Sequence, residues 1–167
     1  MSTLTRFRKQ KDDFFRSSPD SPIGEGAGFE KIDYYDEDPS LVLDLEAKPG
    51  DGSEVRVQTS DGQERVYTRE ALVSFEVDGG DVTLTLYGAG HSDGYFLPFR
   101  DTTSGKETYG AGRYLDIRPA KNGRVKIDFN LAYNPFCAYN DAYSCPLPPG
   151  ENWLQVPIKA GEKDYRR

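Results

Sequence analysis

The amino-acid sequence predicts a mainly β protein: an antiparallel meander that forms a roll, an open barrel or a sandwich, with one helix at the N-terminus. Three observations support this prediction. Apolar and polar residues alternate along several short runs, turn-forming residues separate those runs, and no segment shows the strand, long helix, strand order of a parallel sheet. Such alternation means that each strand buries one face, which is typical of antiparallel sheets.

The N-terminal segment has the spacing of a helix. Ser2 or Thr3 is placed to cap its first turn, and Ser17-Ser18-Pro19 ends it. Between these ends, the side chains that recur at helical intervals are Leu4, Phe7, Lys11, Phe14 and Phe15. A linker rich in Gly and Pro, residues 21–28, then leads into the β body.

The β body contains the alternating runs, and about nine or ten short strands are expected from their spacing. Runs that place an apolar residue at every second position are Leu41–Leu45, Val55–Val57, Val73–Val77, Val82–Leu86 and Val125–Phe129. A further apolar strand is expected at Trp153–Val156. Residues that tolerate positive φ lie between runs, at Pro49–Gly52, Asp61–Gly62, Asp78–Asp81 and Asn122–Gly123. Primed hairpin turns require such residues, so consecutive strands are expected to pair antiparallel.

A chain of 167 residues fits one domain. We expect residues 1–167 to form a single domain with an N-terminal helix (1–18) and a β body (29–163). Within the body, residues 95–163 form a C-terminal signature region that is dense in polar and aromatic residues.

The net charge of −7 argues against a nucleic-acid partner and against an anionic membrane surface, because both require basic patches on the protein. No apolar stretch reaches the roughly 18 residues of a membrane span. The charged N-terminus also lacks the apolar core of a secretory signal. These features predict a soluble, acidic, cytoplasmic protein, and they leave its oligomeric state open.

Two segments match known functional motifs only superficially. Residues 90–94 fit Gly-x-Ser-x-Gly, but an extended segment follows where a nucleophile elbow needs a helix, and His91, the only histidine, lies inside the motif. Ser104–Glu107 lacks both the preceding glycine and the following hydroxyl residue of a phosphate-binding loop. We interpret the first as a glycine-rich loop and the second as a surface turn.

Cys137 and Cys145 are separated by seven residues, which is not a zinc-ligand spacing, and one histidine cannot complete a typical structural zinc site. The first interpretation is a pair of buried thiols, or one local bridge, that packs a loop. A reactive thiolate and a metal site completed by Asp or Glu stay open as alternatives. No cofactor and no metal centre are expected.

Arg113 shares its strand parity with Leu115 and Ile117, so its side chain is expected to point to the apolar side. An inward arginine is costly unless it is paired. The candidate partners are Asp101, Asp128 and Glu162.

A long polar and aromatic loop follows the strand that ends near Asp128. Its amides and phenols could orient and stack a polar ligand, or they could satisfy the backbone of the loop itself. Cys145–Pro149 is expected to be extended and to cover a sheet edge or a pocket. The candidate ligand-binding residues are Arg113, Asp128, Asn130, Tyr133, Asn134, Cys137, Tyr139, Cys145, Asn152 and Glu162.

Eight short segments of the C-terminal signature region form a recognisable pattern: residues 101–109, 112–115, 128–130, 132–135, 137–139, 145–149, 151–152 and 160–163. Together they resemble the signature of a bacterial and archaeal family, the domain-of-unknown-function family sixteen eighty-four. The resemblance covers most of the chain, and it is dense from Phe96 onward and weak before Leu86. It implies no activity, cofactor or partner. It implies only that the family's signature residues fall where the candidate site lies.

Three functions remain open. The first is a module that binds a small polar or anionic ligand, with Arg113 as the anchor for an anionic or carbonyl group. The second is a hydrolase or lyase that needs no metal, with Asp128 or Glu162 as general base or Cys137 as nucleophile. The third is a structural or interaction domain, in which the same polar groups pin the C-terminal loop.

Overall fold

The computed structural model describes residues 2–23, 28–88 and 94–165. Its helices are α1 (Thr3–Ser17) and four short 3-10 helices, η1 (Pro39–Leu41), η2 (Phe129–Leu131), η3 (Phe136–Ala138) and η4 (Gly150–Asn152). Its strands are β1 (Val42–Glu46), β2 (Lys48–Pro49), β3 (Glu54–Gln58), β4 (Glu64–Val77), β5 (Gly80–Gly88), β6 (Tyr95–Phe99), β7 (Arg113–Ile117) and β8 (Arg124–Asp128). His91, most of the Gly-x-Ser-x-Gly motif and part of the expected linker lie outside the described residues.

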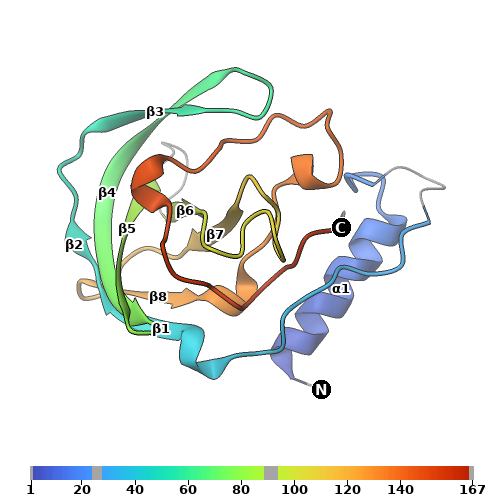
Figure 1. Ribbon diagram of the computed structural model, residues 1–167, viewed down its shortest axis with the longest axis horizontal. Helices are drawn as coiled ribbons and strands as arrows, with labels where there is room; N and C mark the ends of the chain where they lie inside the picture. Colours follow the sequence, from blue (N-terminus) through green and yellow to red (C-terminus); the bar gives the residue numbers. More distant parts are fainter. Residues whose placement is uncertain (1, 24–27, 89–93, 166–167) are drawn as a thin grey trace.

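The strands form two antiparallel sheets (Figure 1). The larger sheet has the order β2-β4-β5-β6-β7, with β3 also paired to β4, and the smaller sheet joins β1 to β8. The sheets curve around the core but do not close into a barrel. The prediction of a mainly antiparallel β fold with one N-terminal helix is therefore confirmed. The organisation of residues 1–167 as a single domain stays a prediction.

Eight strands form in the described ranges, fewer than the expected nine or ten. The expected strand at Trp153–Val156 is wrong. That segment makes a single parallel bridge, between Trp153 and Arg100, directly after η4. The Trp153 indole is half exposed and donates its N–H to the Pro148 carbonyl at 2.8 Å. The segment is therefore an extended cover rather than part of a ladder.

A long hairpin of β4 and β5 dominates the larger sheet. The turn between them was predicted from Asp78–Asp81, and its central residues, Asp78 and Gly79, have positive φ angles of 54° and 78°. The register of β4 shifts between Arg69 and Ala71, which leaves Glu70 as an extra residue. Such a bulge reverses which face of the sheet each later side chain occupies.

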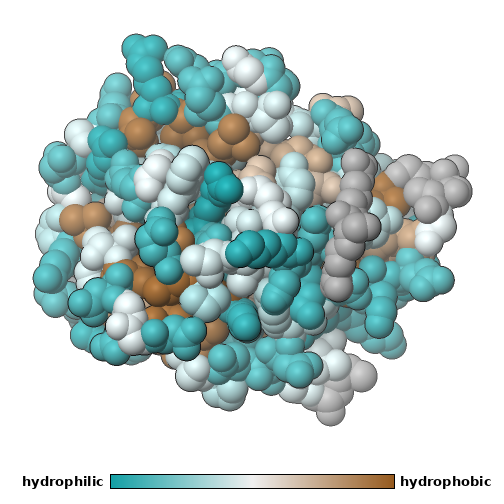
Figure 2. All heavy atoms as spheres, viewed as in Figure 1, coloured by the Kyte–Doolittle hydropathy of each residue, from teal (hydrophilic) through white to brown (hydrophobic). Residues whose placement is uncertain are grey.

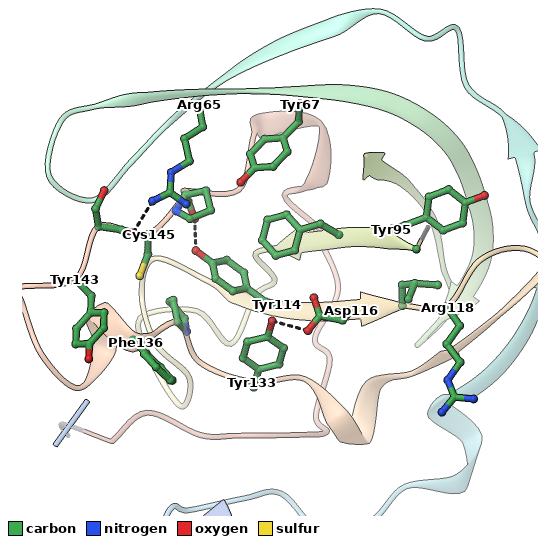
Figure 3. A pocket seen from close by; sticks show the side chains of 16 residues that line it. Arg65, Tyr67, Tyr95, Tyr114, Asp116, Arg118, Tyr133, Phe136, Tyr143 and Cys145 are labelled. Carbon is green, nitrogen blue, oxygen red and sulfur yellow. Dashed lines mark hydrogen bonds between the residues drawn. The ribbon is translucent and has the colours of Figure 1, made fainter. Parts of the chain in front are cut away.

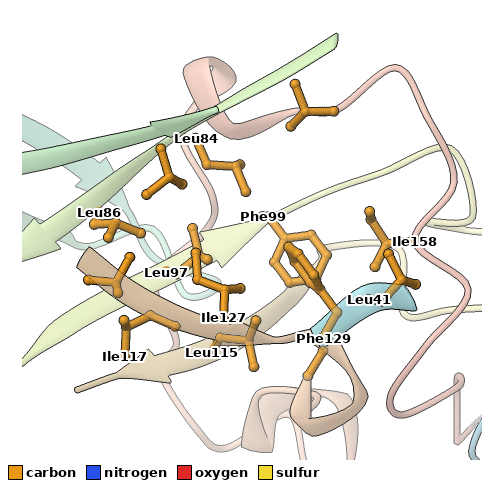
Figure 4. Packing of buried hydrophobic residues seen from close by; sticks show 14 of the residues in the cluster. Leu41, Leu84, Leu86, Leu97, Phe99, Leu115, Ile117, Ile127, Phe129 and Ile158 are labelled. Atoms are coloured by element: carbon orange, nitrogen blue, oxygen red, sulfur yellow. The ribbon is translucent and has the colours of Figure 1, made fainter. Parts of the chain in front are cut away.

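One side of the larger sheet packs into the main hydrophobic core (Figure 4). Its side chains come from alternate positions on β4 to β8, and Ile158 and Ala160 close it from the C-terminal segment. Leu84, Leu86, Leu97 and Phe99 are fully buried there. Burial of each such side chain contributes about 1.5–3 kcal/mol of transfer free energy.

Helix α1 packs against the C-terminal region rather than against the main core (Figure 1). Ser2 is its N-cap and accepts a hydrogen bond from the Thr5 backbone N–H at 3.0 Å. Phe15, its buried side chain, packs edge-on against Tyr139, with ring centroids 4.9 Å apart. No helix in the described ranges has the length and apolarity to cross a bilayer. Figure 2 shows one face of the molecule as largely hydrophilic, with small separated groups of hydrophobic residues.

The proline-rich segment Cys145–Pro149 covers an edge of the larger sheet. The Leu147 N–H donates to the Gln58 carbonyl at 2.7 Å, and Pro146 bridges to Thr59, just beyond β3. This segment therefore fixes the end of the C-terminal loop against the β3–β4 hairpin.

Candidate functional site

Arg113 is buried, as its strand parity predicted, with 1% of its surface exposed. Its guanidinium donates to the Asp101 carboxylate at 3.1 Å and to the backbone carbonyls of Ile158, Ala160 and Glu162. Asp101 in turn accepts the Ile158 N–H at 2.7 Å. Burial lowers the pKa of the guanidinium and the Asp101 charge opposes that shift. The pair holds residues 158–162, the C-terminal strap, against β7, and Arg113 is not part of the lining of the aromatic pocket described below.

Glu162 forms a second buried network. Its carboxylate accepts hydrogen bonds from the Tyr139 hydroxyl at 2.7 Å and the Asn134 N–H at 3.0 Å, and it pairs with Lys11 of α1. Gly161 makes this possible, because its φ is +82° and an added Cβ would lie 2.6 Å from the Ala132 carbonyl oxygen. Asn134 Oδ1 is buried and has no hydrogen-bond partner among the described residues. This network fixes α1 to the loop after β8.

Asn152 is fully buried and connects two strands that diverge. The pairing between β5 and β6 consists of a single pair, Tyr87 and Phe96. Beyond it, the Asn152 amide accepts the Thr85 N–H and donates to the Thr85 and Pro98 carbonyls, all at 2.9 Å. The side chain therefore replaces the missing ladder bonds.

Asn130 and Asp128 form a fourth polar contact, at the end of the smaller sheet. The Asn130 amide pairs with both backbone groups of Asp38, at 2.8 and 2.9 Å, and also donates to the Asp128 carboxylate. The structure thus distributes these sequence-predicted residues over four local networks instead of one cluster, and the first two meet where Arg113 donates to the Glu162 carbonyl. Neither Asp128 nor Glu162 lines the aromatic pocket of about 830 Å³, where a general base would be needed.

That pocket lies on the opposite face of β6 and β7, under the loop that follows β8 (Figure 3). Its volume is about 830 Å³. The lining residues are Arg65, Tyr67, Gly94, Tyr95, Phe96, Tyr114, Asp116, Ile117, Arg118, Tyr133, Pro135, Phe136, Tyr143, Ser144, Cys145 and Pro146. Of the sequence-predicted residues, only Tyr133 and Cys145 belong to this lining.

The bulge in β4 brings Tyr67 to this face. Ala71 pairs with Leu86 on the core side, whereas Arg69 pairs with Tyr87 on the other side. Tyr67 has the parity of Arg69, and its ring lies 5.7 Å from that of Phe96. Without the extra residue, Tyr67 would share the core face with Ala71.

Three polar contacts shape the pocket wall. The Tyr133 hydroxyl donates to the Asp116 carboxylate at 2.8 Å, and the Arg65 guanidinium donates to the Ser144 carbonyl at 2.8 Å. The Tyr114 hydroxyl donates to the Pro146 carbonyl. Burial raises the pKa of Tyr114 and Tyr133 far above the ordinary value, so both phenols stay protonated near neutral pH.

Cys137 and Cys145 are both free and buried at one end of this pocket. Cys145 is part of the wall, and Cys137 lies next to it in a cluster with Tyr114. The expectation of buried thiols is confirmed, and no bridge joins them. The interaction with the Cys145 thiol and the hydrogen bond with Tyr109 outweigh the effect of burial and lower the pKa of Cys137 to about 6. Hydrogen bonding to Cys137 and burial raise the pKa of Cys145.

The pocket contains residues that the sequence reasoning missed, above all Arg65, Tyr67, Asp116 and Arg118. One signal could have indicated them. Phe96 and Tyr114 are large aromatic residues at positions opposite in parity to the core residues Leu97 and Leu115, so the second face of these strands is also covered. No group of three or more His, Cys, Asp or Glu side chains suited to a metal ion occurs within the described residues.

Comparison with known proteins identifies a family and solved structures that resemble this chain. Residues 27–163 match the model of a family described as "Protein of unknown function (DUF1684)". The solution NMR structure of an uncharacterized protein from Haloarcula marismortui is 37% identical, covers 98% of this chain and 94% of its own, and superposes with a TM-score of 0.74. No curated protein matches the chain.

Proposed function

This chain belongs to the DUF1684 family of proteins of unknown function, and we propose that it binds a small molecule that combines a planar, aromatic body with a negatively charged group. The observation that carries the proposal is the aromatic pocket under the loop after β8. The sequence also led us to expect a ligand-binding function, but with Arg113 at the site. The proposed site instead lies on the opposite face of the same strand.

The size and lining of the pocket support this function. Its volume of about 830 Å³ lies within the range of small-molecule sites, roughly 300–1,000 Å³. Seven of the lining side chains are aromatic: Tyr67, Tyr95, Phe96, Tyr114, Tyr133, Phe136 and Tyr143. Rings that wall a cavity favour a flat ligand, because stacked and edge-on contacts add to the burial of apolar area.

Two arginines supply the preference for negative charge. Arg65 and Arg118 lie at opposite ends of the pocket in Figure 3. Arg118 makes no hydrogen bond or ion pair with any described residue, so its donors are free for a carboxylate or a similar anion. The Asp116 carboxylate between them can accept a hydrogen bond from a ligand hydroxyl or amine.

The proposal can be tested with a matched pair of probes, 2-naphthoate and its neutral amide, 2-naphthamide. Binding would be followed by two-dimensional NMR of the labelled protein. We expect 2-naphthoate to shift the resonances of residues 114–118, 133–136 and 143–146. The neutral amide is expected to bind about tenfold more weakly, the effect of losing one charge-assisted contact worth about 1.4 kcal/mol.

Two variants identify the arginine responsible. Arg118→Ala is expected to reduce the preference for the anion to about twofold or less, since the charge contact provides most of it. Arg56→Ala is the control, because Arg56 is an exposed arginine of β3 outside the pocket lining. Shifts scattered over the surface, or equal binding of the two probes by the unmodified protein, would refute the proposal.

For the buried polar residues we propose the architectural role. Arg113, Asn130, Asn152 and Glu162 each join segments far apart in the sequence through hydrogen bonds to backbone groups or buried side chains. A cytoplasmic location also remains a proposal. It is supported by the two free cysteines, which fit a reducing compartment.

A further inference from the structure

The two cysteines approach each other from opposite ends of one loop. Cys137 lies on η3, and Cys145 begins the proline-rich segment that is held against β3. The Cys145 N–H donates to the Ser60 hydroxyl at 3.1 Å, and the Ser60 N–H donates to the Cys145 carbonyl at 2.8 Å. Cys145 is therefore fixed against Ser60, and both cysteines belong to one buried cluster with Tyr114.

The surroundings of Cys137 favour its thiolate form. The Tyr109 hydroxyl lies 3.6 Å from its sulfur, within the range of a hydrogen bond to sulfur. The Cys145 thiol and the Cys137 backbone N–H also lower the pKa of this group. Several donors that converge on one buried sulfur stabilise a negative charge without a neighbouring cation.

We propose that Cys137 and Cys145 form a redox-active dithiol that reduces a small hydroperoxide at the wall of the aromatic pocket. Cys137 is the attacking sulfur and Cys145 is the resolving sulfur. The reaction goes beyond the proposed ligand binding and does not depend on it, since the pocket serves here only as the route of entry.

The chemistry balances with hydrogen peroxide as the oxidant. The Cys137 thiolate attacks one peroxide oxygen and the O–O bond breaks, which leaves a sulfenic acid on Cys137. The departing hydroxide takes up the proton that the Cys137 thiol released to solvent when it ionised, and becomes the first water. The Cys145 sulfur then attacks the sulfenic sulfur, an S–S bond forms, and the S–O bond breaks. The thiol proton leaves with that oxygen as water. The two thiols lose two electrons, the peroxide becomes two waters, and an external thiol reductant restores the dithiol.

The burial of the pair limits the oxidant to a small one. Cys145 contributes to the pocket wall, whereas Cys137 is not part of the lining and only 5% of its surface is exposed. A bulky peroxide would have to displace Phe136 or Tyr143, which pack edge-on 5.2 Å apart. Hydrogen peroxide is therefore expected to react faster than cumene hydroperoxide.

The test is intact-mass spectrometry of the reduced full chain exposed to hydrogen peroxide at pH 7. We expect a loss of about two mass units, no thiol left for alkylation, and recovery of both thiols with dithiothreitol. In Cys145→Ser, which keeps the attacking sulfur, dimedone added in denaturant after the exposure should trap a sulfenic acid on Cys137. In Cys137→Ser, Cys145 should stay unmodified over the same time.

A conservative variant distinguishes oxidation that depends on the surroundings of Cys137 from oxidation that any accessible thiol would undergo. Tyr109→Phe removes one hydrogen bond to Cys137. A resulting rise of about one unit in the Cys137 pKa would slow oxidation about fivefold at pH 6, because the thiolate fraction falls by that factor. Tyr165→Phe is the control, since it removes a tyrosine hydroxyl outside both the pocket lining and the cluster around Cys137, and circular dichroism verifies that both variants fold.

Three outcomes would overturn the proposal: two thiols that persist after exposure to peroxide, disulfides that join two chains, or Cys145 trapped by dimedone in Cys137→Ser as quickly as Cys137 in Cys145→Ser. The result is independent of ligand binding. Oxidation without 2-naphthoate binding would refute the proposed function alone, and the reverse would refute the dithiol alone.

Discussion

The two faces of β6 and β7 differ in what their side chains do. On the core face, Leu97 and Leu115 pair across the strands and are almost completely buried. On the opposite face, Phe96 pairs with Asp116, and Tyr114 is covered by a loop that leaves an 830 Å³ cavity. One face thus stabilises the fold, and the other leaves room for a ligand.

Arg113 and Arg118 show the same contrast between the core face and the pocket face. Arg113 begins β7 on the core face, and its Nη atoms bind one carboxylate and three backbone carbonyls. Arg118 follows the end of β7, is exposed and lines the pocket. A buried charge bound to the protein's own backbone supports structure, whereas a free charge beside a cavity is available to a ligand.

The largest expected effect on the free energy of unfolding comes from a substitution on the core face. Arg113→Met should lower the free energy of unfolding by about 3–5 kcal/mol, because it leaves the Asp101 carboxylate buried without its partner and three carbonyls without donors. Urea denaturation followed by circular dichroism measures this change. A loss below about 1 kcal/mol would mean that the pair is not what holds the C-terminal strap in place.

Asn152→Ala should have the next largest effect, a loss of about 2–3 kcal/mol. It leaves the Thr85 N–H and the Thr85 and Pro98 carbonyls unpaired where β5 and β6 diverge, and unsatisfied buried groups cost about 1–3 kcal/mol each before water relieves them. Hydrogen exchange of residues 84–88 and 96–99 should speed up in this variant. Exchange that stays unchanged would show that Asn152 does not substitute for the ladder.

The core face could largely be predicted from sequence. Period-two alternation identified β1, β3, β5, β8 and the second half of β4. Successive side chains of a strand point to opposite faces, so a strand with one buried face has an apolar residue at every second position. The same parity argument placed Arg113 inside and included Asp101 among its partners. Local physics was sufficient here, since each inference required only the neighbours of a residue along its own strand.

The pocket face could not be predicted in the same way. Tyr67 reaches it only because Glu70 is an extra residue in β4, and whether a strand bulges depends on the strands beside it. Arg65 lies on β4 and Arg118 directly follows β7. Because β5 and β6 separate these two strands, the common pocket depends on the order of strands in the sheet. The asparagines were placed in one site for a related reason: the sequence shows that they need partners, but not which backbone supplies them.

A gradual effect on stability is expected from pH through Cys137, which lies on the pocket side. Its pKa falls from 9.0 in an unstructured chain to about 6 in the fold, because Cys145 and Tyr109 donate to its thiolate. The stabilisation is therefore present above pH 9 and is lost as the pH falls toward 6. Under reducing conditions the free energy of unfolding should rise by up to on the order of 1 kcal/mol per pH unit across this window. Cys137→Ser should flatten the rise, and an equal rise in both proteins would contradict the assignment of the low pKa.

The smallest expected effect on stability is that of Arg118→Ala, the pocket-face counterpart of Arg113→Met. Arg118 is exposed and makes no hydrogen bond or ion pair with the described residues, so its removal should change the free energy of unfolding by less than about 0.5 kcal/mol. Urea denaturation at the pH of the Arg113→Met experiment gives the comparison. A loss above about 1 kcal/mol would show that Arg118 also stabilises the fold. The inference that only the core face serves stability would then be wrong. If stability is unchanged while 2-naphthoate loses its advantage over 2-naphthamide, the charge at Arg118 serves binding and not folding.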